Sequence, residues 1–448
     1  MFIMKKYIYI LCLLMTVALS SCGMSKNTAG TDNGQIKLKI AAIYSAGSLS
    51  DDILKFKKDN PGIDIEVKTY ESYAEPERSF IMDLTSGDLP DVIVAPRNIL
   101  FKLAKRGLIE DIYPYIDSDK ELSREDFLPS VLNAYEIDGK LYQTVSLVNL
   151  HSWATDKNEF TTTGRWNLES FKNYIEGNKE KKVLVSYSMD GISKAILTGV
   201  LSDYIDWEEG KCDFINEKFY ELMDVIAYVR EHSDIQYEQD QDSELSLIED
   251  GGLLFKCCDI DEGLCSTEYL KCEKVFKRNA VYLGPPVSDG SATSFGCDVK
   301  RGDCPQMYSL VSGKNKKDEA WKFVRYFLAE DYQKLRPEMI SSGLDIYGFP
   351  TRKDSFEDYL KRYTAKEDYT YNGETVPVEE RLDVFSSYTE ELGEKYRDLV
   401  NNTDRVDIYD DQVMGIAVDE LNSYFSGERS KEDAAKHIQS RVEKYLAE

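Results

Sequence analysis

The chain has 448 residues, of which 42% are hydrophobic, so it is long enough for two ordinary domains with sizeable cores. It carries 81 acidic and 55 basic residues, a formal net charge of −26. This acidity argues against a nucleic-acid-binding protein and against attachment to anionic lipid through a basic face, because both need clustered basic side chains. An acidic excess of this kind is typical of a well-solvated surface.

Residues 1–21 have the pattern of a signal peptide. A basic pair precedes an apolar run from Tyr7 to Leu19, which is too short to cross a bilayer. Small residues then precede Cys22 and resemble a bacterial lipobox, which implies cleavage before Cys22 and acylation of its thiol. The alternative is an ordinary secretory peptide. Residues 22–35, rich in small and polar residues, predict a flexible tether.

Strand and helix patterns alternate after the tether. Residues 36–43 and 63–67 predict strands, and the spacing from Asp51 to Lys58 predicts a helix between them. A second helix is predicted over Pro76 to Thr85, followed by Val-Ile-Val at 92–94, a β-branched run typical of a buried parallel strand. This order predicts a parallel sheet with right-handed crossovers.

Residues 87–96, Gly-Asp-Leu-Pro-Asp-Val-Ile-Val-Ala-Pro, are central to this part of the chain. The Gly-Asp pair favours a turn, and Pro90 keeps the approach to the strand extended. A further helix is predicted over Phe101 to Lys105. In open α/β sheets ligands lie outside the carboxyl ends of the strands, so the loop after this strand is a candidate for ligand contact.

The same stretch resembles a segment of the family 1 extracellular solute-binding proteins, the lipid-anchored sugar receptors of ABC importers. Three neighbouring segments resemble this family in the same order, namely Phe-Lys-Lys-Asp-Asn-Pro-Gly-Ile-Asp-Ile-Glu-Val at 56–67, Gly-Leu-Ile-Glu-Asp-Ile-Tyr-Pro-Tyr-Ile at 107–116 and Asp-Gly-Lys-Leu-Tyr-Gln-Thr-Val at 138–145. Later segments that resemble it include Trp-Asn-Leu-Glu-Ser-Phe at 166–171, Glu-Ala-Trp-Lys-Phe at 319–323 and Gly-Phe-Pro-Thr-Arg at 348–352. The resemblance runs from about residue 36 to the end.

The resemblance implies an α/β fold of the periplasmic-binding-protein-like type II class. Each of two lobes would contain a mixed, mostly parallel sheet flanked by helices, and three chain segments would form a hinge. The first lobe would comprise 36–148 and 300–346, and the second lobe 149–299 and 347–448. Asn167 is expected to cap the helix that starts the second lobe.

Enzyme and metal motifs find little support in the sequence. It has three histidines and lacks the zinc-protease, nucleophile-elbow and phosphate-loop motifs. Asp259-x-Asp261-Glu262-Gly263 weakly resembles a calcium loop, but Leu270 stands where that loop needs a glutamate. We therefore expect a protein that is not an enzyme and that holds no metal or cofactor.

Nine cysteines are present, and seven remain beyond the leader and Cys22. Their spacing does not fit the short Cys-x-x-Cys clips of zinc sites. An exported protein can form disulfides, and Cys297 and Cys304, separated by six residues, are the best candidate pair. The alternative is that these cysteines stay reduced.

Sugars are held by hydrogen-bonding side chains and by aromatic rings under their C–H faces, and the chain has 30 tyrosines and 4 tryptophans. The candidate ligand residues lie in strand-end and crossing loops: Ser45, Glu71, Tyr73, Arg97, Asn98, Asn149, His151, Trp153, Asp190, Phe255 and Tyr409. The resemblance implies a polar sugar contact near Arg97. It also implies stacking near Phe255 and Tyr409, where relatives often have tryptophan.

The resemblance implies a monomeric, lipid-anchored receptor on the outer face of the cytoplasmic membrane. It would capture a mono- or oligosaccharide between its lobes and deliver it to the permease subunits of an ABC transporter. Three alternatives stay open: a receptor for a peptide or another polar solute, a surface glycan-active hydrolase, and an adhesin lipoprotein.

Overall fold

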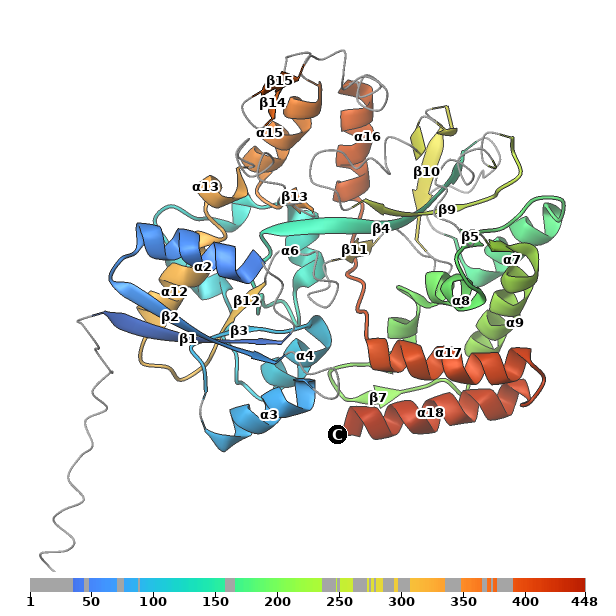
Figure 1. Cartoon of the computed structure of the whole chain (residues 1–448), viewed down its shortest axis with the longest axis horizontal. Coiled ribbons are helices and arrows are strands. Elements are labelled where there is room, and N and C mark those ends of the chain that lie inside the picture. The colour runs from blue at the N-terminus through green and yellow to red at the C-terminus, as the bar shows by residue number, and fades with distance from the viewer. Residues whose placement is uncertain are drawn as a thin grey trace, which may run out of the picture.

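Two larger β-sheets with helices packed on their faces form the framework of the chain (Figure 1). The computed structural model describes residues 35–43, 48–70, 76–87, 89–157, 166–235, 247, 250–260, 272–273, 275–277, 279–284, 294–296, 307–334, 348–364, 369–371, 374–376 and 390–447. No helix in these ranges is both long and apolar enough to cross a membrane.

The first sheet has the strand order β12-β3-β1-β2. Its strands are β1 (Ile36–Ile43), β2 (Ile63–Tyr70), β3 (Val92–Val94) and β12 (Tyr308–Leu310). β1 runs parallel to β2 and β3, and β12 runs antiparallel to β3. The three strands predicted from the sequence are therefore confirmed. β12 joins them from far along the chain.

The central strands β1 and β3 are largely buried on both faces, as expected for strands covered by helices. Leu38, Ile40 and Ala42 of β1 contribute to one hydrophobic cluster, whereas Ala41 and Ile43 contribute to another. The covering helices are α2 (Ser48–Asp59), α3 (Pro76–Ser86), α4 (Arg97–Lys105) and α12 (Lys317–Tyr326). α4 begins directly after Pro96, earlier than the sequence predicted, because the extended Pro96 itself occupies the N-cap position.

Asp91 fixes the start of β3. Its carboxylate is 3% exposed and accepts a hydrogen bond of 2.9 Å from the backbone nitrogen of Lys39 on β1. Lys316 Nζ lies 3.5 Å and Lys314 Nζ 3.9 Å from the same carboxylate. Asp91 therefore stabilises the first sheet, and it connects the start of β3 to two lysines that precede α12.

The substitution Asp91→Asn is expected to lower the free energy of unfolding by about 2 kcal/mol, because a buried, charge-assisted network loses its charge. Urea denaturation followed by circular dichroism measures this. The matched control is Asp64→Asn, since Asp64 pairs with Lys57 at 2.6 Å on the surface and should change stability by less than about 0.5 kcal/mol. Equal losses in the two variants would contradict the role of Asp91.

The second sheet is built around one long strand, β4 (Leu147–Asp156). Its partners are β9 (Lys256–Ile260), β10 (Ala280–Leu283), β11 (Ser294–Gly296) and β13 (Phe349–Pro350). All four run antiparallel to β4. Parallel pairing beyond the first sheet is found between β5 (Val185–Ser186) and β8 (Asp234–Ile235).

The second lobe was expected to contain a mostly parallel sheet. The sheet around β4 is antiparallel instead, which corrects this expectation. Strand direction depends on how the connecting segments return to the sheet, which local sequence patterns do not encode. β4 separates two hydrophobic clusters, because successive side chains point to opposite faces. Val148, Leu150 and Ala154 face one cluster, and Trp153 faces the other.

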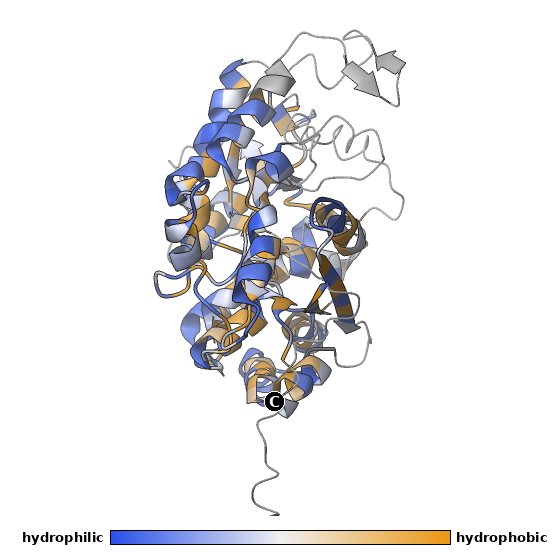
Figure 2. Ribbon diagram, turned by 90° about the vertical axis from the view of Figure 1, so that its left-hand side faces the viewer, coloured by the Kyte–Doolittle hydropathy of each residue, from blue (hydrophilic) through white to orange (hydrophobic). Residues whose placement is uncertain are grey.

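Helices surround this second sheet (Figure 1). Those of the cluster that contains Trp153 are α7 (Leu168–Gly177), α8 (Met189–Leu197), α9 (Glu217–His232), α17 (Asp411–Phe425) and α18 (Lys431–Ala447). The opposite cluster includes α6 (Pro129–Tyr135), α15 (Lys353–Thr364) and α16 (Glu390–Asn401). Asn167 caps α7 as predicted. Several helices combine hydrophilic and hydrophobic residues (Figure 2), as amphipathic helices that cover a sheet do.

The remaining elements are short. They are α5 (Tyr113–Ser118), α13 (Glu330–Gln333), the 3-10 helices η1 (Arg124–Asp126) and η2 (Leu201–Tyr204), and the two-stranded pairs β6 (Ile205–Asp206) with β7 (Lys211–Cys212) and β14 (Tyr369–Tyr371) with β15 (Glu374–Val376).

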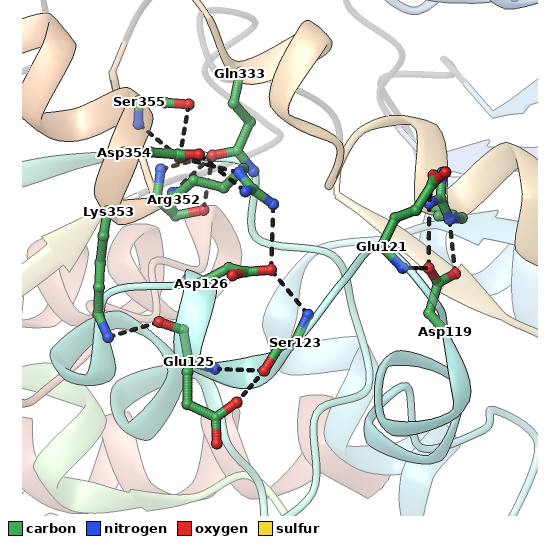
Figure 3. Close-up of polar contacts among 12 residues, drawn as sticks. Asp119, Glu121, Ser123, Glu125, Asp126, Gln333, Arg352, Lys353, Asp354 and Ser355 are labelled. Carbon is green, nitrogen blue, oxygen red and sulfur yellow. Dashed lines mark hydrogen bonds and ion pairs between the residues drawn. The ribbon is translucent and has the colours of Figure 1, made fainter.

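Residues 348–352, the Gly-Phe-Pro-Thr-Arg segment, form hydrogen bonds and ion pairs with several other parts of the chain. β13 pairs with the start of β4, and the backbone nitrogen of Thr351 donates to Ser146 O at 3.1 Å. Gln333 Oε1 accepts from the backbone nitrogens of Thr351 at 3.0 Å and Arg352 at 2.8 Å. Figure 3 shows the Arg352 guanidinium between Asp354 and Asp126, 3.0 and 3.6 Å away. The two chain segments that precede β4 and α15 are thus held side by side.

Candidate ligand site

Arg97 stands at the carboxyl end of β3, as the first residue of α4. Its guanidinium donates to the carbonyl oxygens of Tyr135 at 2.9 Å, Glu136 at 3.2 Å and Ala134 at 3.4 Å. It also lies over the rings of Tyr135 and Phe101, at 5.4 and 5.3 Å from their centroids. A cation at this position stabilises the C-terminus of α6, where unpaired carbonyls gather.

The charge of Arg97 is balanced by these carbonyl dipoles. Its Nε is buried and makes no hydrogen bond, and no carboxylate of the described residues forms an ion pair with it. Burial lowers the pKa of Arg97 to about 10, which still leaves the side chain protonated at neutral pH. Arg97 therefore places a cation at the carboxyl edge of the first sheet while it holds α6 in place.

Asn98 follows Arg97 and faces the other half of the chain. Its Nδ2 donates to Asp410 Oδ2 at 2.6 Å, and the hydroxyl of Tyr445 donates to the same oxygen at 2.8 Å. The second carboxylate oxygen of Asp410 accepts from the backbone nitrogens of Gln412 and Val413 and so caps α17. Asn98 is buried in this contact between α4 and α17.

Asn149, His151 and Tyr409 gather around β11. Asn149 lies opposite Gly296 in the β4–β11 register, and His151 lies opposite Ser294. Tyr409 belongs to a segment that runs along the same strand, because Phe295 N donates to Arg405 O and Asp407 N donates to Phe295 O, each at 2.8 Å. These three candidates therefore come from two segments that flank one short strand.

The rings of Tyr135 and Phe295 connect this group to Arg97. Their centroids are 6.4 Å apart, and Arg97 lies over the ring of Tyr135. The place where α4, α6, β11 and residues 405–410 meet is thus the one at which most of the described candidates converge. We define it as the candidate ligand site.

Residues 53–216 match the model of a family described as bacterial extracellular solute-binding protein. Among solved structures, the chain is similar to a family 1 extracellular solute-binding protein from Alicyclobacillus acidocaldarius subsp. acidocaldarius DSM 446, with 13% identity, a TM-score of 0.53 and coverage of 93% of this chain and 100% of that one. The sugar-binding protein MalE from Xanthomonas citri gives 13% identity, a TM-score of 0.55 and coverage of 92% and 97%. The maltose/maltodextrin-binding domain MalE from Bdellovibrio bacteriovorus, bound to maltotriose, has 16% identity and a TM-score of 0.50. The match covers 92% of this chain and 100% of that one. No curated protein matches the sequence.

The predicted resemblance to the extracellular solute-binding proteins is confirmed over residues 53–216, which match the family model. The predicted MalE-like α/β fold is confirmed with it. Members of this family are binding proteins, and the family is extracellular.

Two of the residues predicted to contact a solute lie in the core of the chain. Trp153 and Phe255 are 4% and 0% exposed. Their ring centroids are 5.8 Å apart, and both rings pack against Trp166 and Phe171. This corrects their assignment as ligand-contact residues, because their surfaces are covered by other aromatic side chains.

Asp190 lies apart from the candidate ligand site, in the first turn of α8. It accepts a hydrogen bond of 2.9 Å from Asn422 on α17, and Arg230 on α9 lies 3.8 Å away. Asp190 thus connects α8 to α17 and α9. These contacts do not support its predicted role in solute contact.

Several predicted residues lie outside the described residues. They are Ser45, Glu71, Tyr73, Cys22, Cys297 and Cys304. Among the residues that are described, no group of three or more histidine, cysteine or acidic side chains is arranged to hold a metal.

Sequence reasoning missed Tyr135, Phe295 and Asp410. Tyr135 and Phe295 carry no motif, so their roles follow only from packing. Asp410 did carry a signal, because an aspartate before the Val413 helix is a favourable N-cap.

Proposed function

We propose that this chain is a lipid-anchored extracellular receptor that captures a carbohydrate between two lobes and delivers it to the permease of an ABC transporter. The supporting observation is the convergence, around β11, of candidates from both halves: Arg97 from α4, and Asn149, His151 and Tyr409 from the other side. The lipid anchor at Cys22 and the monomeric state belong to this proposal and rest on the sequence.

The two lobes are proposed as residues 36–148 with 300–346 and residues 149–299 with 347–448. The first sheet supports this division, since β12 completes a sheet whose other strands lie before residue 95. The cluster that contains Trp153 supports it too, because α17 and α18 pack with α7, α8 and α9. Segments 145–148 and 348–352, bonded side by side, would form part of the hinge.

A carbohydrate fits the chemistry of the candidate ligand site. Neutral amide and phenol groups, as in Asn149 and Tyr409, donate and accept hydrogen bonds, and an aromatic ring can stack on the C–H face of a sugar. A similar structure, MalE from Bdellovibrio bacteriovorus, is bound to maltotriose.

A matching sugar is expected to raise the melting temperature of the mature chain by about 2 to 5 °C at a hundredfold excess over its dissociation constant, because it binds only the folded form. Differential scanning fluorimetry with a panel of mono- and oligosaccharides that includes maltotriose measures this shift. Tyr409→Ala should lose the shift, whereas Tyr187→Ala should keep it, since Tyr187 is 60% exposed.

The same assay separates the alternatives. A shift with a peptide mixture and none with the sugars would favour a receptor for another polar solute. Turnover of chromogenic glycosides would show a hydrolase. A protein that responds to no sugar in a broad panel would contradict the proposal.

A further inference from the structure

α4 has two faces with different partners. Its apolar face packs into the cluster on one side of the first sheet, through Ile99, Leu100 and Leu103. The other face is formed by residues at helical spacing: Asn98, Phe101, Lys102 and Lys105. We call these four residues the closing face.

Each residue of the closing face contacts an element of the proposed second lobe. Asn98 donates to Asp410 at the start of α17, and Phe101 packs against the cluster that contains Trp153. Lys102 Nζ lies 3.5 Å from the carbonyl oxygen of Leu446 near the end of α18, where a cation is favoured. Lys105 pairs with the carboxylate of Glu209 and lies 3.4 Å from Glu208 O.

The centre of this contact is shielded from solvent, whereas its edge is exposed to solvent. Asn98 and Asp410 are 3% and 4% exposed, and the carboxylate also accepts from Tyr445. Lys105 and Glu209 are both more than 40% exposed, so their attraction is screened by solvent and salt. The hydrogen bond of Asn98 to a buried carboxylate should therefore contribute more than the exposed ion pair.

The contact lies away from the segments proposed as the hinge. In Figure 1, α4 lies near α17 and the C-terminal end of α18 in the lower part of the view, and β4 and β13 lie above them. The closing face therefore joins the two proposed lobes through side chains at a place separate from their covalent connection.

We propose that the closing face and Asp410 form a latch that stabilises the closed form of the protein without solute contact. This inference rests on the two-lobe division in the proposed function. It reassigns Asn98 from solute contact to the open–closed equilibrium. Solute affinity would depend on the latch, because apparent affinity scales with the population of the binding-competent form.

Single-molecule energy transfer on the mature, solute-free chain tests the latch. Dyes attached through a keto amino acid at Lys58 on α2 and Glu217 on α9 would report the distance between the lobes and leave the native cysteines untouched. Asn98→Ala should raise the ratio of open to closed molecules about tenfold, as expected for loss of a charge-assisted hydrogen bond. Tyr445→Phe should shift the ratio in the same direction by less, since Asn98 still holds Asp410.

The matched control is Asn422→Ala. It removes an asparagine–aspartate hydrogen bond of 2.9 Å, to Asp190, that lies within the proposed second lobe. Its open-to-closed ratio should equal that of the wild type. Unchanged ratios in both Asn98→Ala and Tyr445→Phe, or an equal shift in Asn422→Ala, would overturn the latch. Because no sugar is added, this result is independent of whether the chain binds carbohydrate.

Discussion

Gly348→Ala is expected to lower the free energy of unfolding by about 3 kcal/mol. Gly348 has φ of 121°, a conformation that side chains with a Cβ rarely adopt. A Cβ built there would lie 2.8 Å from Val148 O, 3.1 Å from Val148 C and 3.2 Å from Val148 N. These are backbone atoms of β4, so relief requires that β13 leave its partner strand.

Urea denaturation measures this loss, and Gly415→Ala is the matched control. Gly415 lies within α17, and a Cβ there meets no atom within 4 Å apart from its chain neighbours and the backbone of its own helix. The same substitution should therefore stabilise the protein, by up to about 1 kcal/mol, because alanine favours the helix. A loss below about 1 kcal/mol in Gly348→Ala would show that the segment adjusts easily, and the account of a tightly bonded 348–352 segment would then be wrong.

Phe255→Ala is expected to cost about 4 kcal/mol of stability, since it opens a cavity in the aromatic core. The Phe255 ring centroid lies 5.0 Å from that of Trp166 and 5.6 Å from those of Phe171 and Tyr174. None of these neighbours can fill the vacated space without leaving its own partners.

Two measurements on this variant distinguish a core residue from a solute-contact residue. A core residue loses stability in urea and keeps its sugar-induced shift in melting temperature, whereas a stacking residue does the reverse. Tyr187→Ala is the control for removal of an aromatic ring, because its exposed side chain should change stability by less than about 0.5 kcal/mol. Near-wild-type stability in Phe255→Ala would restore the original assignment.

The sequence was sufficient for three of the four strands of the first sheet and for the resemblance to a family of solute-binding proteins. Alternation in β1 and β2 and the β-branched run in β3 are local patterns, and each strand formed where its pattern stood. Asn167 capped its helix because the capping side chain and its backbone partner are three residues apart. The order of several short family segments then indicated a solute-binding protein, although each segment alone was weak.

The candidate ligand site could be predicted only in part. Arg97 was identified because it follows a buried parallel strand, and the structure does place it at the carboxyl edge of the first sheet. The same reasoning gave Asn98 a solute role, but its amide is bound to Asp410, 312 residues further along the chain. No local pattern encodes a partner at that distance.

The sequence by itself determined those features that depend on residues close together along the chain. These are the turn, strand and helix patterns, the helix caps and the order of the family segments. The tertiary structure decided the features set by neighbours in space. It turned the strands around β4 antiparallel, put Trp153 and Phe255 in the core and paired Asn98 with Asp410. The physical reason is that an aromatic or amide side chain can serve a core, a contact between lobes or a solute, and only the segments that pack around it select among these.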